Sequence, residues 1–557
     1  MARDKKFTRR ILYTICFILL CIIDQRKGSV TGSWQMILPN FISFCLALLV
    51  LPSCKLKDFK APVYLIWCLT CIVAIPTLTI FFHDAILSQF YPLQWVTGVL
   101  SVALWGTLFI YAILHTKWKF FFLTYRFQLI FSLVLLLFGF SINDSIWPWQ
   151  YLLMYGTLAL VTIPADDKKL IILSLADGII FSFFMLQGFA FLFRPYDEIR
   201  YLGMYSNTNI NALFYQMVYC SFLAKYLHAQ NAISERYKLF HSALLLFFCG
   251  SMWSFVLLTV SRSAMFSMIL STMVAGIYYL SKQPAKQILS KGSRLIISLL
   301  LYIILSFPLT YGAARYLPTI LHHPVWFHAE YTEEKVHSFD PWDSPKYTSW
   351  RDVLDLNFHR IVELFSQSPE NDISRLPNSF YQFNINRSLL VTNELTAAML
   401  SEVMYLPPVL EYYTGDSSII RSTIYNQYLS KLNTLGHRNI ENGVQVTPSY
   451  YAPHAHNLYL QFAFNFGIPA GILFILATLS TLCGYVEQGM CKNNSEDNRL
   501  IFITCAIFYI SCLAFGMVEI MWLNGELPFT LLFLLPSLIP PFPREDKRLQ
   551  SQESQQE

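Results

Sequence analysis

The sequence predicts an all-α fold: a polytopic transmembrane helix bundle with a helical cap on its outer face, formed by one large loop. Three observations predict this. Apolar residues make up 55% of the chain and charged residues only 13%. Apolar runs repeatedly reach the ~20 residues that a helix needs to cross a hydrocarbon core. One long polar segment, residues 314–456, separates the later runs, and a segment of this length in a compact protein is expected to contain structure of its own.

The apolar runs give about fourteen candidate spans. Their approximate limits are 11–23, 35–54, 61–82, 92–115, 119–141, 147–164, 168–193, 209–227, 239–260, 262–280, 295–313, 457–483, 500–519 and 523–540. The basic first ten residues precede a short apolar run, as in a signal peptide, but no small-residue cleavage site follows, so we interpret this run as an uncleaved first span. The expected organisation is a bundle over 1–313 with spans 1–11, the outer loop 314–456, spans 12–14 over 457–540, and the tail 541–557.

The distribution of basic residues predicts the orientation. Lys and Arg are concentrated in every second loop and in the tail, at Lys55, Lys57, Lys60, Lys117, Lys119, Lys168, Lys169, Lys225, Arg236, Lys238, Lys282, Lys286, Lys291, Arg294, Lys492, Arg499, Arg544, Lys547 and Arg548. This positive-inside bias places both termini in the cytoplasm and the large loop outside. We therefore expect a multi-pass protein of the cell inner (cytoplasmic) membrane.

The large loop is the most informative segment. It contains eight of the twelve histidines and none of the twelve cysteines, so no disulfide is expected to staple it. Amphipathic stretches at 347–365, 389–404 and 418–432 predict helices of the cap. The sequence has no zinc-type cysteine spacing, Walker loop or dinucleotide fingerprint, which argues against ATP-driven transport by this chain alone. His454 and His456 lack a carboxylate or cysteine at fitting spacing, so we expect no metal.

Two short polar segments border apolar runs on the outer side. His456 and Asn457 stand where the loop ends and the twelfth span begins, with Asn457 as the expected N-cap. Arg262 stands in the segment Ser261-Arg262-Ser263-Ala264, at a turn predicted to lie outside, with Ser261 as the expected N-cap of the tenth span. Two helix N-termini and an arginine would form an anion site if tertiary packing brings them together.

Structural roles explain several of these residues equally well. Taken alone, Arg262 is expected to extend toward lipid headgroups. His456 alone fits an interfacial hydrogen-bonding role as well as it fits catalysis.

Some residues within the spans are expected to be purely structural. Gly467 and Gly471 have the spacing that lets another helix pack closely, and Pro469 is expected to kink the twelfth span. Asp177 and Arg126 fall in the inner halves of their spans, where we expect a structural buried pair rather than a proton path.

The segment 456–471 resembles the signature of the O-antigen ligase and O-antigen polymerase superfamily: His, then Asn, Ser or Gln, nine residues, and a Gly-rich turn into a helix. The spacing from Asn457 to Gly467 fits, whereas Ala470 stands at the expected second glycine and Gly471 follows it. The segment 261–264 is similar to the Ser-Arg-Ser element of the family. The segment 203–212 resembles its Asn-x-Asn element, with Thr208 in place of the usual proline. The resemblance covers residues 200–480.

The resemblance implies a metal-independent, inverting glycosyl transfer on the outer leaflet, without a cofactor. The donor would be a glycan on undecaprenyl diphosphate and the acceptor a sugar hydroxyl. Arg262 would clamp the diphosphate through charge-assisted hydrogen bonds, and His456 would be the base that takes the acceptor proton. A second arginine in the outer loop is usual in the family, and Arg421 is the candidate; the solvated face of a cap helix is the alternative role for it.

The remaining candidates are polar residues near these segments. They would contact sugar or phosphate and comprise Asn457, Asn207, Asn209 and Ser261. For Asn207 and Asn209, capping of the eighth span is the alternative role.

Three functions remain open. A polymerase of O-antigen or capsule type would join repeat units of a cell-surface polysaccharide, and the large cap, which has room for a long polymer, favours it. A ligase would transfer the finished glycan to lipid A core of lipopolysaccharide or to another acceptor. A non-catalytic transporter of lipid-linked sugars would have an internal repeat and charged residues along a central path. We find no such repeat. The expected partners are the lipid-linked donor, a glycan or lipid acceptor and membrane lipids, and no nucleic acid.

Overall fold

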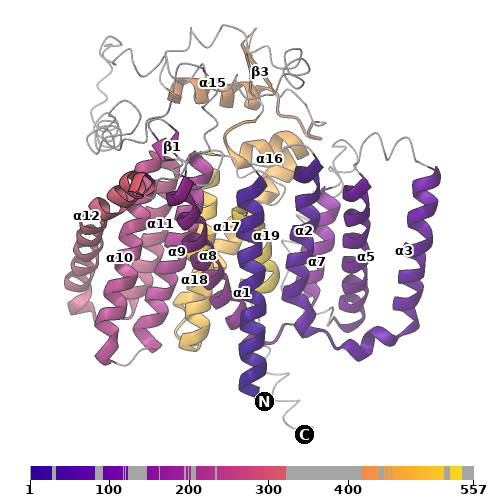
Figure 1. Ribbon diagram of the computed structural model, residues 1–557, viewed down its shortest axis with the longest axis horizontal. Coiled ribbons are helices and arrows are strands. Elements are labelled where there is room, and N and C mark those ends of the chain that lie inside the picture. Colours follow the sequence, from indigo (N-terminus) through magenta and orange to yellow (C-terminus); the bar gives the residue numbers. More distant parts are fainter. Residues whose placement is uncertain are drawn as a thin grey trace.

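The computed structural model is a mostly helical bundle (Figure 1). It describes residues 2–27, 33–81, 92–116, 118, 121–122, 147–161, 163–193, 196–197, 200–201, 203, 208–232, 235–320, 417–437, 444–447, 450–452, 454–519 and 527–541. Its longer helices are α1 (Ala2–Lys27), α2 (Ser33–Val50), α3 (Pro62–Phe81), α5 (Pro92–His115), α7 (Trp147–Leu160), α8 (Ala165–Phe193), α9 (Thr208–Ala232), α10 (Glu235–Thr259), α11 (Arg262–Ser281), α12 (Ile288–Ile320), α15 (Ser417–Ser430), α16 (Leu458–Phe466), α17 (Ile468–Met490), α18 (Glu496–Gly516) and α19 (Leu527–Leu538).

Seven helices of the described chain are long and apolar enough to cross a membrane. Their spans are Val96–His115, Asp166–Phe191, Tyr237–Thr259, Arg262–Ser281, Ala285–Ala314, Ile468–Met490 and Glu496–Gly516. These helices are compatible with a multi-pass membrane protein, as the composition predicts. The expected span at 119–141 lies almost entirely outside the described residues, as do the expected cap helices at 347–365 and 389–404. The expected helix at 418–432 is confirmed as α15.

Two small antiparallel hairpins accompany the helices. Strands β1 (Tyr196–Asp197) and β2 (Arg200–Tyr201) pair just before α9, and β3 (Val444–Thr447) pairs with β4 (Tyr450–Ala452) just before α16. Helix α15 and strand β3 lie beyond the end of the bundle where α16 lies, and α1 begins at the opposite end (Figure 1).

Helix α18 lies at the centre of the bundle, and 89% of its apolar 18-residue stretch is buried. Polar contacts fix how its neighbours are aligned. In α9, Gln216 donates to the carbonyl oxygen of Ser511 at 2.8 Å; in α11, Tyr278 donates to Glu496 at 2.8 Å. Both helices therefore run antiparallel to α18, so the N-terminal ends of α9 and α11 are level with the C-terminal end of α18.

The expected twelfth span at 457–483 is divided between two helices, and only the second is long enough to cross a membrane. Helix α16 ends at Phe466, Gly467 follows with φ of 89° and ψ of 159°, and α17 begins at Ile468. Pro469 therefore stands in the first turn of α17, where its missing N–H costs no hydrogen bond, and it kinks no helix. Nine residues of α16 are too few to cross a membrane.

Close backbone approach explains the two glycines. A Cβ atom on Gly467 would overlap the carbonyl oxygen of Thr434, because the segment after α15 docks on the junction of α16 and α17. The Ile468 N–H donates to the carbonyl oxygen of Asn433 at 2.9 Å. A Cβ atom on Gly471 would collide with Ala463 of α16. Both glycines therefore allow close packing, as expected. Their partners, however, are the loop after α15 and the preceding helix α16, not another membrane-spanning helix.

Replacing Gly467 with alanine is expected to destabilise the fold by at least ~1–3 kcal/mol, because the residue has a positive φ and the new methyl group overlaps backbone. Thermal unfolding in detergent measures this. Gly276→Ala in α11 is the matched control, because a Cβ atom there meets nothing within 4 Å. Equal melting temperatures for the two variants would contradict the prediction.

The bundle end away from α16 carries ion pairs. Arg9 pairs with Asp167 at 2.6 Å, and Asp177 pairs with both Arg10 and Lys225. Asp177 is therefore held in ion pairs between α1, α8 and α9. The expected partner, Arg126, lies outside the described residues.

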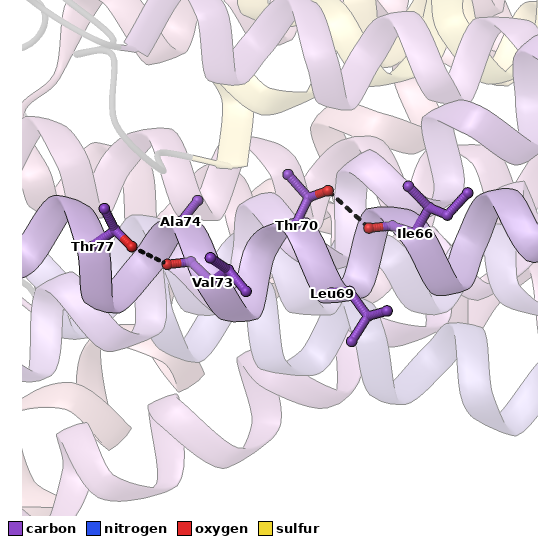
Figure 2. A pocket seen from close by; sticks show the side chains of 6 residues that line it. All are labelled: Ile66, Leu69, Thr70, Val73, Ala74 and Thr77. Atoms are coloured by element: carbon purple, nitrogen blue, oxygen red, sulfur yellow. Dashed lines mark hydrogen bonds between the residues drawn. The ribbon is translucent and has the colours of Figure 1, made fainter.

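Helix α3 presents an open apolar groove at the edge of the bundle. Figure 2 shows its lining residues, which are Ile66, Leu69, Thr70, Val73, Ala74 and Thr77. Both threonine hydroxyls donate to carbonyl oxygens of the preceding helical turn. The groove has no ionisable side chain and fits a lipid-facing surface rather than a site of chemistry.

Candidate functional site

Asn457 is the N-cap of α16, as expected. Its Oδ1 accepts from the Leu460 N–H at 3.0 Å, and its Nδ2 donates to the carbonyl oxygen of Met517 at 2.8 Å. The cap therefore also ties the start of α16 to the end of α18. Because the oxygen and the nitrogen of its side-chain amide both form hydrogen bonds within the protein, the geometry favours capping over substrate binding for this residue.

His456 precedes this cap in a strained conformation. Its φ of 48° lies in the left-handed region, which costs a non-glycine residue ~1–3 kcal/mol and persists only where the surroundings impose it. The Tyr425 hydroxyl of α15 donates to the His456 carbonyl oxygen at 3.1 Å. Its imidazole Nδ1 lies 3.3 Å from Oε2 of Glu519. The backbone strain and these two contacts aim the ring at the end of α18.

Glu519 is the centre of the site, although it is not among the residues predicted from the sequence. It follows the C-terminal end of α18, and only 8% of its surface is exposed. Its Oε1 accepts from Arg421 at 2.5 Å and from Nδ2 of Asn209 at 3.1 Å. The signal that would have found it is an acidic residue at the end of an apolar span, where an unpaired carboxylate is costly.

The charge of Glu519 is stabilised by its neighbours. Burial raises the pKa of its carboxyl group, but the hydrogen bond to His456 and the positive charge of Arg421 outweigh burial and hold the pKa below its ordinary value. The carboxylate is therefore ionised at neutral pH and acts as a hydrogen-bond acceptor.

Arg421 contacts Glu519 and is only partly exposed, so it does not lie on the fully solvated helix face that was its alternative role. It projects from α15, and about a third of its side chain is exposed (34%). Besides Glu519, its guanidinium donates to the carbonyl oxygen of Val518 at 3.3 Å. Arg421 thus attaches the segment that contains α15 to the end of α18.

The remaining polar candidates are placed differently. Asn209 is the second residue of α9, so it is not the helix cap, and its side chain contacts Glu519 instead. Asn207 lies outside the described residues. Ser261 is the N-cap residue of α11, but its side chain forms no capping bond; its Oγ lies 3.2 Å from Oγ of Ser263, and only 2% of its surface is exposed. This burial speaks against substrate binding by Ser261.

Arg262 is the exposed first residue of α11. The hydrogen bond from Ser271 to the Ile507 carbonyl oxygen places this first turn level with the end of α18, one turn before Glu519. The contacts that define the cluster do not include Arg262. Val260, two residues earlier, has φ of 53°, and among the described non-glycine residues only Val260 and His456 have positive φ. Backbone strain thus lies at His456 in one predicted motif segment and directly before the other.

The expected anion site takes another form. The contacts of Glu519 bring together the N-terminal ends of α9 and α16, not those of α11 and α16, the arginine is Arg421 rather than Arg262, and the anion between them is the carboxylate of Glu519. We call His456, Glu519, Arg421 and Asn209 the Glu519 cluster. In the part of the chain that the structure describes, no three His, Cys, Asp or Glu side chains gather as metal ligands.

The Glu519 cluster has the parts of a general base with its orienting group. A carboxylate next to Nδ1 favours the tautomer whose Nδ1–H donates to it, and this leaves Nε2 as the proton acceptor. The guanidinium of Arg421 adds positive charge on the other oxygen of the same carboxylate, and it has donors beyond the two that bond to Glu519 and Val518. The arrangement can take a proton from a hydroxyl group and stabilise negative charge nearby.

Removing Arg421 tests whether it holds α15 in place. Arg421→Ala is expected to speed amide hydrogen exchange across α15 relative to α18, because it breaks the contacts with Glu519 and Val518. The free energy of unfolding should fall by about 2 kcal/mol. This is less than the ~3–5 kcal/mol lost when a fully buried ion pair is broken, because a third of the Arg421 side chain is exposed. Arg499→Ala, which breaks an ion pair at the other end of α18, is the control. Unchanged exchange in α15 would contradict the assignment.

In comparisons with known proteins, the sequence matches no protein-family model and no curated protein.

Proposed function

We propose that the protein is a membrane glycosyltransferase of cell-surface polysaccharide assembly. It transfers or polymerises glycan from an undecaprenyl-diphosphate donor on the outer leaflet of the cytoplasmic membrane. One observation carries the proposal: His456, Arg421 and Asn209, taken from three separate sequence segments, meet on the single carboxylate of Glu519. A base, a cation and an orienting carboxylate are the groups that a metal-independent transfer from a diphosphate needs.

The proposal includes a topology of about fourteen spans with both termini in the cytoplasm and the loop 314–456 as an outer cap. Two features support it. The Glu519 cluster lies at the bundle end where α15 is found, and the basic start of α1 lies at the opposite end (Figure 1). The ion pairs of Arg9, Lys169 and Lys282 also lie at that opposite end. The donor glycan would then meet the cluster outside the membrane.

In the proposed reaction, Nε2 of His456 takes the proton of an acceptor hydroxyl, and the freed oxygen attacks the anomeric carbon of the donor. The bond from that carbon to the diphosphate oxygen breaks, and its electron pair leaves with undecaprenyl diphosphate. The remaining donors of Arg421, together with Arg262 from the adjacent first turn of α11, stabilise the negative charge that develops on the diphosphate. Glu519 keeps the imidazole oriented throughout.

A polymerase and a ligase would share this cluster, and we favour the polymerase because the loop before His456 is large enough to hold a growing chain. The test uses purified protein in lipid nanodiscs with the native lipid-linked glycan. Release of undecaprenyl diphosphate together with a longer lipid-linked glycan would identify a polymerase. Release with transfer to a different acceptor would identify a ligase. Binding or translocation of the glycan lipid without release would contradict a transferase and favour a transporter.

A further inference from the structure

His454 is a second imidazole beside the base, and neither the fold nor the proposed reaction accounts for it. Its ring centroid lies 4.2 Å from that of His456, with the two ring planes at 71°. Its Nδ1 atom is buried, and no described residue is its hydrogen-bond partner. A buried polar atom without a hydrogen-bond partner costs ~1–3 kcal/mol. A hydrogen bond from this nitrogen to a ligand that approaches His456 would remove this cost.

The backbone on both sides of His454 is fixed. The Tyr428 hydroxyl donates to the Ala452 carbonyl oxygen at 2.9 Å, and the Ala455 N–H donates to Oε1 of Gln461 at 2.7 Å. Both Ala452 and Ala455 are completely buried. The imidazole is therefore held by hydrogen-bonded backbone on both sides. A binding residue must be held in this way if it is to select one position of a ligand group.

The chemistry of this nitrogen favours a hydroxyl group as its ligand. Burial first, and then the neighbouring imidazole of His456, lower the pKa of His454 to about 4, while Glu519 opposes this in part. The ring is thus neutral at physiological pH. A neutral imidazole nitrogen exchanges a hydrogen bond with a hydroxyl well, whereas a phosphate is bound best by a charged group.

We propose that His454 binds the acceptor sugar, with Nδ1 forming a hydrogen bond to a hydroxyl next to the one that His456 deprotonates. This inference rests on the proposed function and deepens it: His456 performs the proton transfer, and His454 selects which acceptor hydroxyl reaches the base. Two touching rings present their nitrogens to neighbouring hydroxyls of one sugar ring, which sets the position of the new linkage.

Two substitutions separate this role from packing. His454→Phe keeps a ring beside His456 but has no polar nitrogen, and His454→Asn keeps an amide near the place of Nδ1. The acceptor probe is the oligosaccharide released from the native lipid-linked glycan by mild acid. His454→Phe is expected to raise the acceptor KM about tenfold, the effect of one lost hydrogen bond, with kcat within about threefold of wild type. His454→Asn should stay within about threefold in both constants, and the donor KM should not change.

A wild-type acceptor KM in His454→Phe would overturn the inference. So would a loss of kcat at unchanged KM, because His454 would then act only through His456. If His454→Phe does not fold, His454→Leu takes its place with the same expectation.

A binding measurement separates this inference from the proposed function. Affinity for the oligosaccharide is compared between His456→Ala protein and the same protein with His454→Phe added, where no turnover is needed. Weaker binding by the double variant supports the role of His454, and equal binding overturns it. If wild type releases no undecaprenyl diphosphate while oligosaccharide binding still depends on His454, the transferase fails and the glycan-binding role of His454 stands.

Discussion

Replacing His456 with alanine is expected to lower the rate of undecaprenyl diphosphate release by ~100- to 10,000-fold, the contribution of a positioned general base. In the proposed reaction Nε2 of His456 takes the acceptor proton, because Nδ1 faces Oε2 of Glu519 at 3.3 Å. Donor binding should change little, since the positive charge of Arg421 remains. Single-turnover kinetics with the native lipid-linked glycan in nanodiscs measures both quantities.

His437→Ala is the matched control for this substitution. His437 belongs to the same loop and also contacts α16: its ring stacks on Phe464 at 4.1 Å, and its Nδ1 lies 2.9 Å from the Phe464 carbonyl oxygen. Its loss weakens docking of the loop without touching the Glu519 cluster. If the two variants lose the same activity, the effect comes from the loop, and the catalytic assignment of His456 is wrong.

Replacing Glu519 with glutamine is expected to lower kcat by ~10- to 100-fold, a part of the ~100- to 10,000-fold that a positioned base contributes. The amide has nearly the same shape but no charge. It can turn its NH2 group toward Nδ1 of His456 and so favour the wrong imidazole tautomer. Arg421 also loses the carboxylate that holds it at 2.5 Å. Steady-state kinetics with both substrates should show the loss in kcat, with a smaller change in KM.

Glu496→Gln is the control for loss of a paired carboxylate from α18. Glu496 lies at the opposite end of this helix, where it pairs with Lys282 and Arg499. Its replacement should leave kcat within about twofold of wild type, since exposed pairs contribute little. A Glu519→Gln protein with wild-type kcat would show that the carboxylate does not orient the base.

The acid dependence of stability gives Glu519 a second signature. Its folded-state pKa lies below its ordinary value of 4.5, so the carboxylate stabilises the folded protein above pH 4.5. This stabilisation is lost as the pH falls through the lowered folded-state pKa. As the pH is lowered from 5 into the range below 4.5, the unfolding temperature should therefore fall less steeply for Glu519→Gln than for wild type.

The sequence by itself determined the helical class, the membrane-compatible helices and the start of α16. These follow from contiguous signals: an apolar run long enough for a membrane, and an Asn at the border of such a run whose side chain caps the next turn. The helix at α15 followed in the same way from its amphipathic pattern, and His456 was recognisable because it directly precedes the cap.

Only the tertiary structure decided which residues meet. Glu519 lies 63 residues from His456, 98 from Arg421 and 310 from Asn209, and no local pattern encodes such contacts. The break at Gly467 also depends on a distant partner, the backbone of Thr434, so an apolar run read alone looks continuous there. Local propensity and apolar length are properties of neighbouring residues, whereas the pairing of a buried carboxylate depends on which helix ends the packing around α18 brings together.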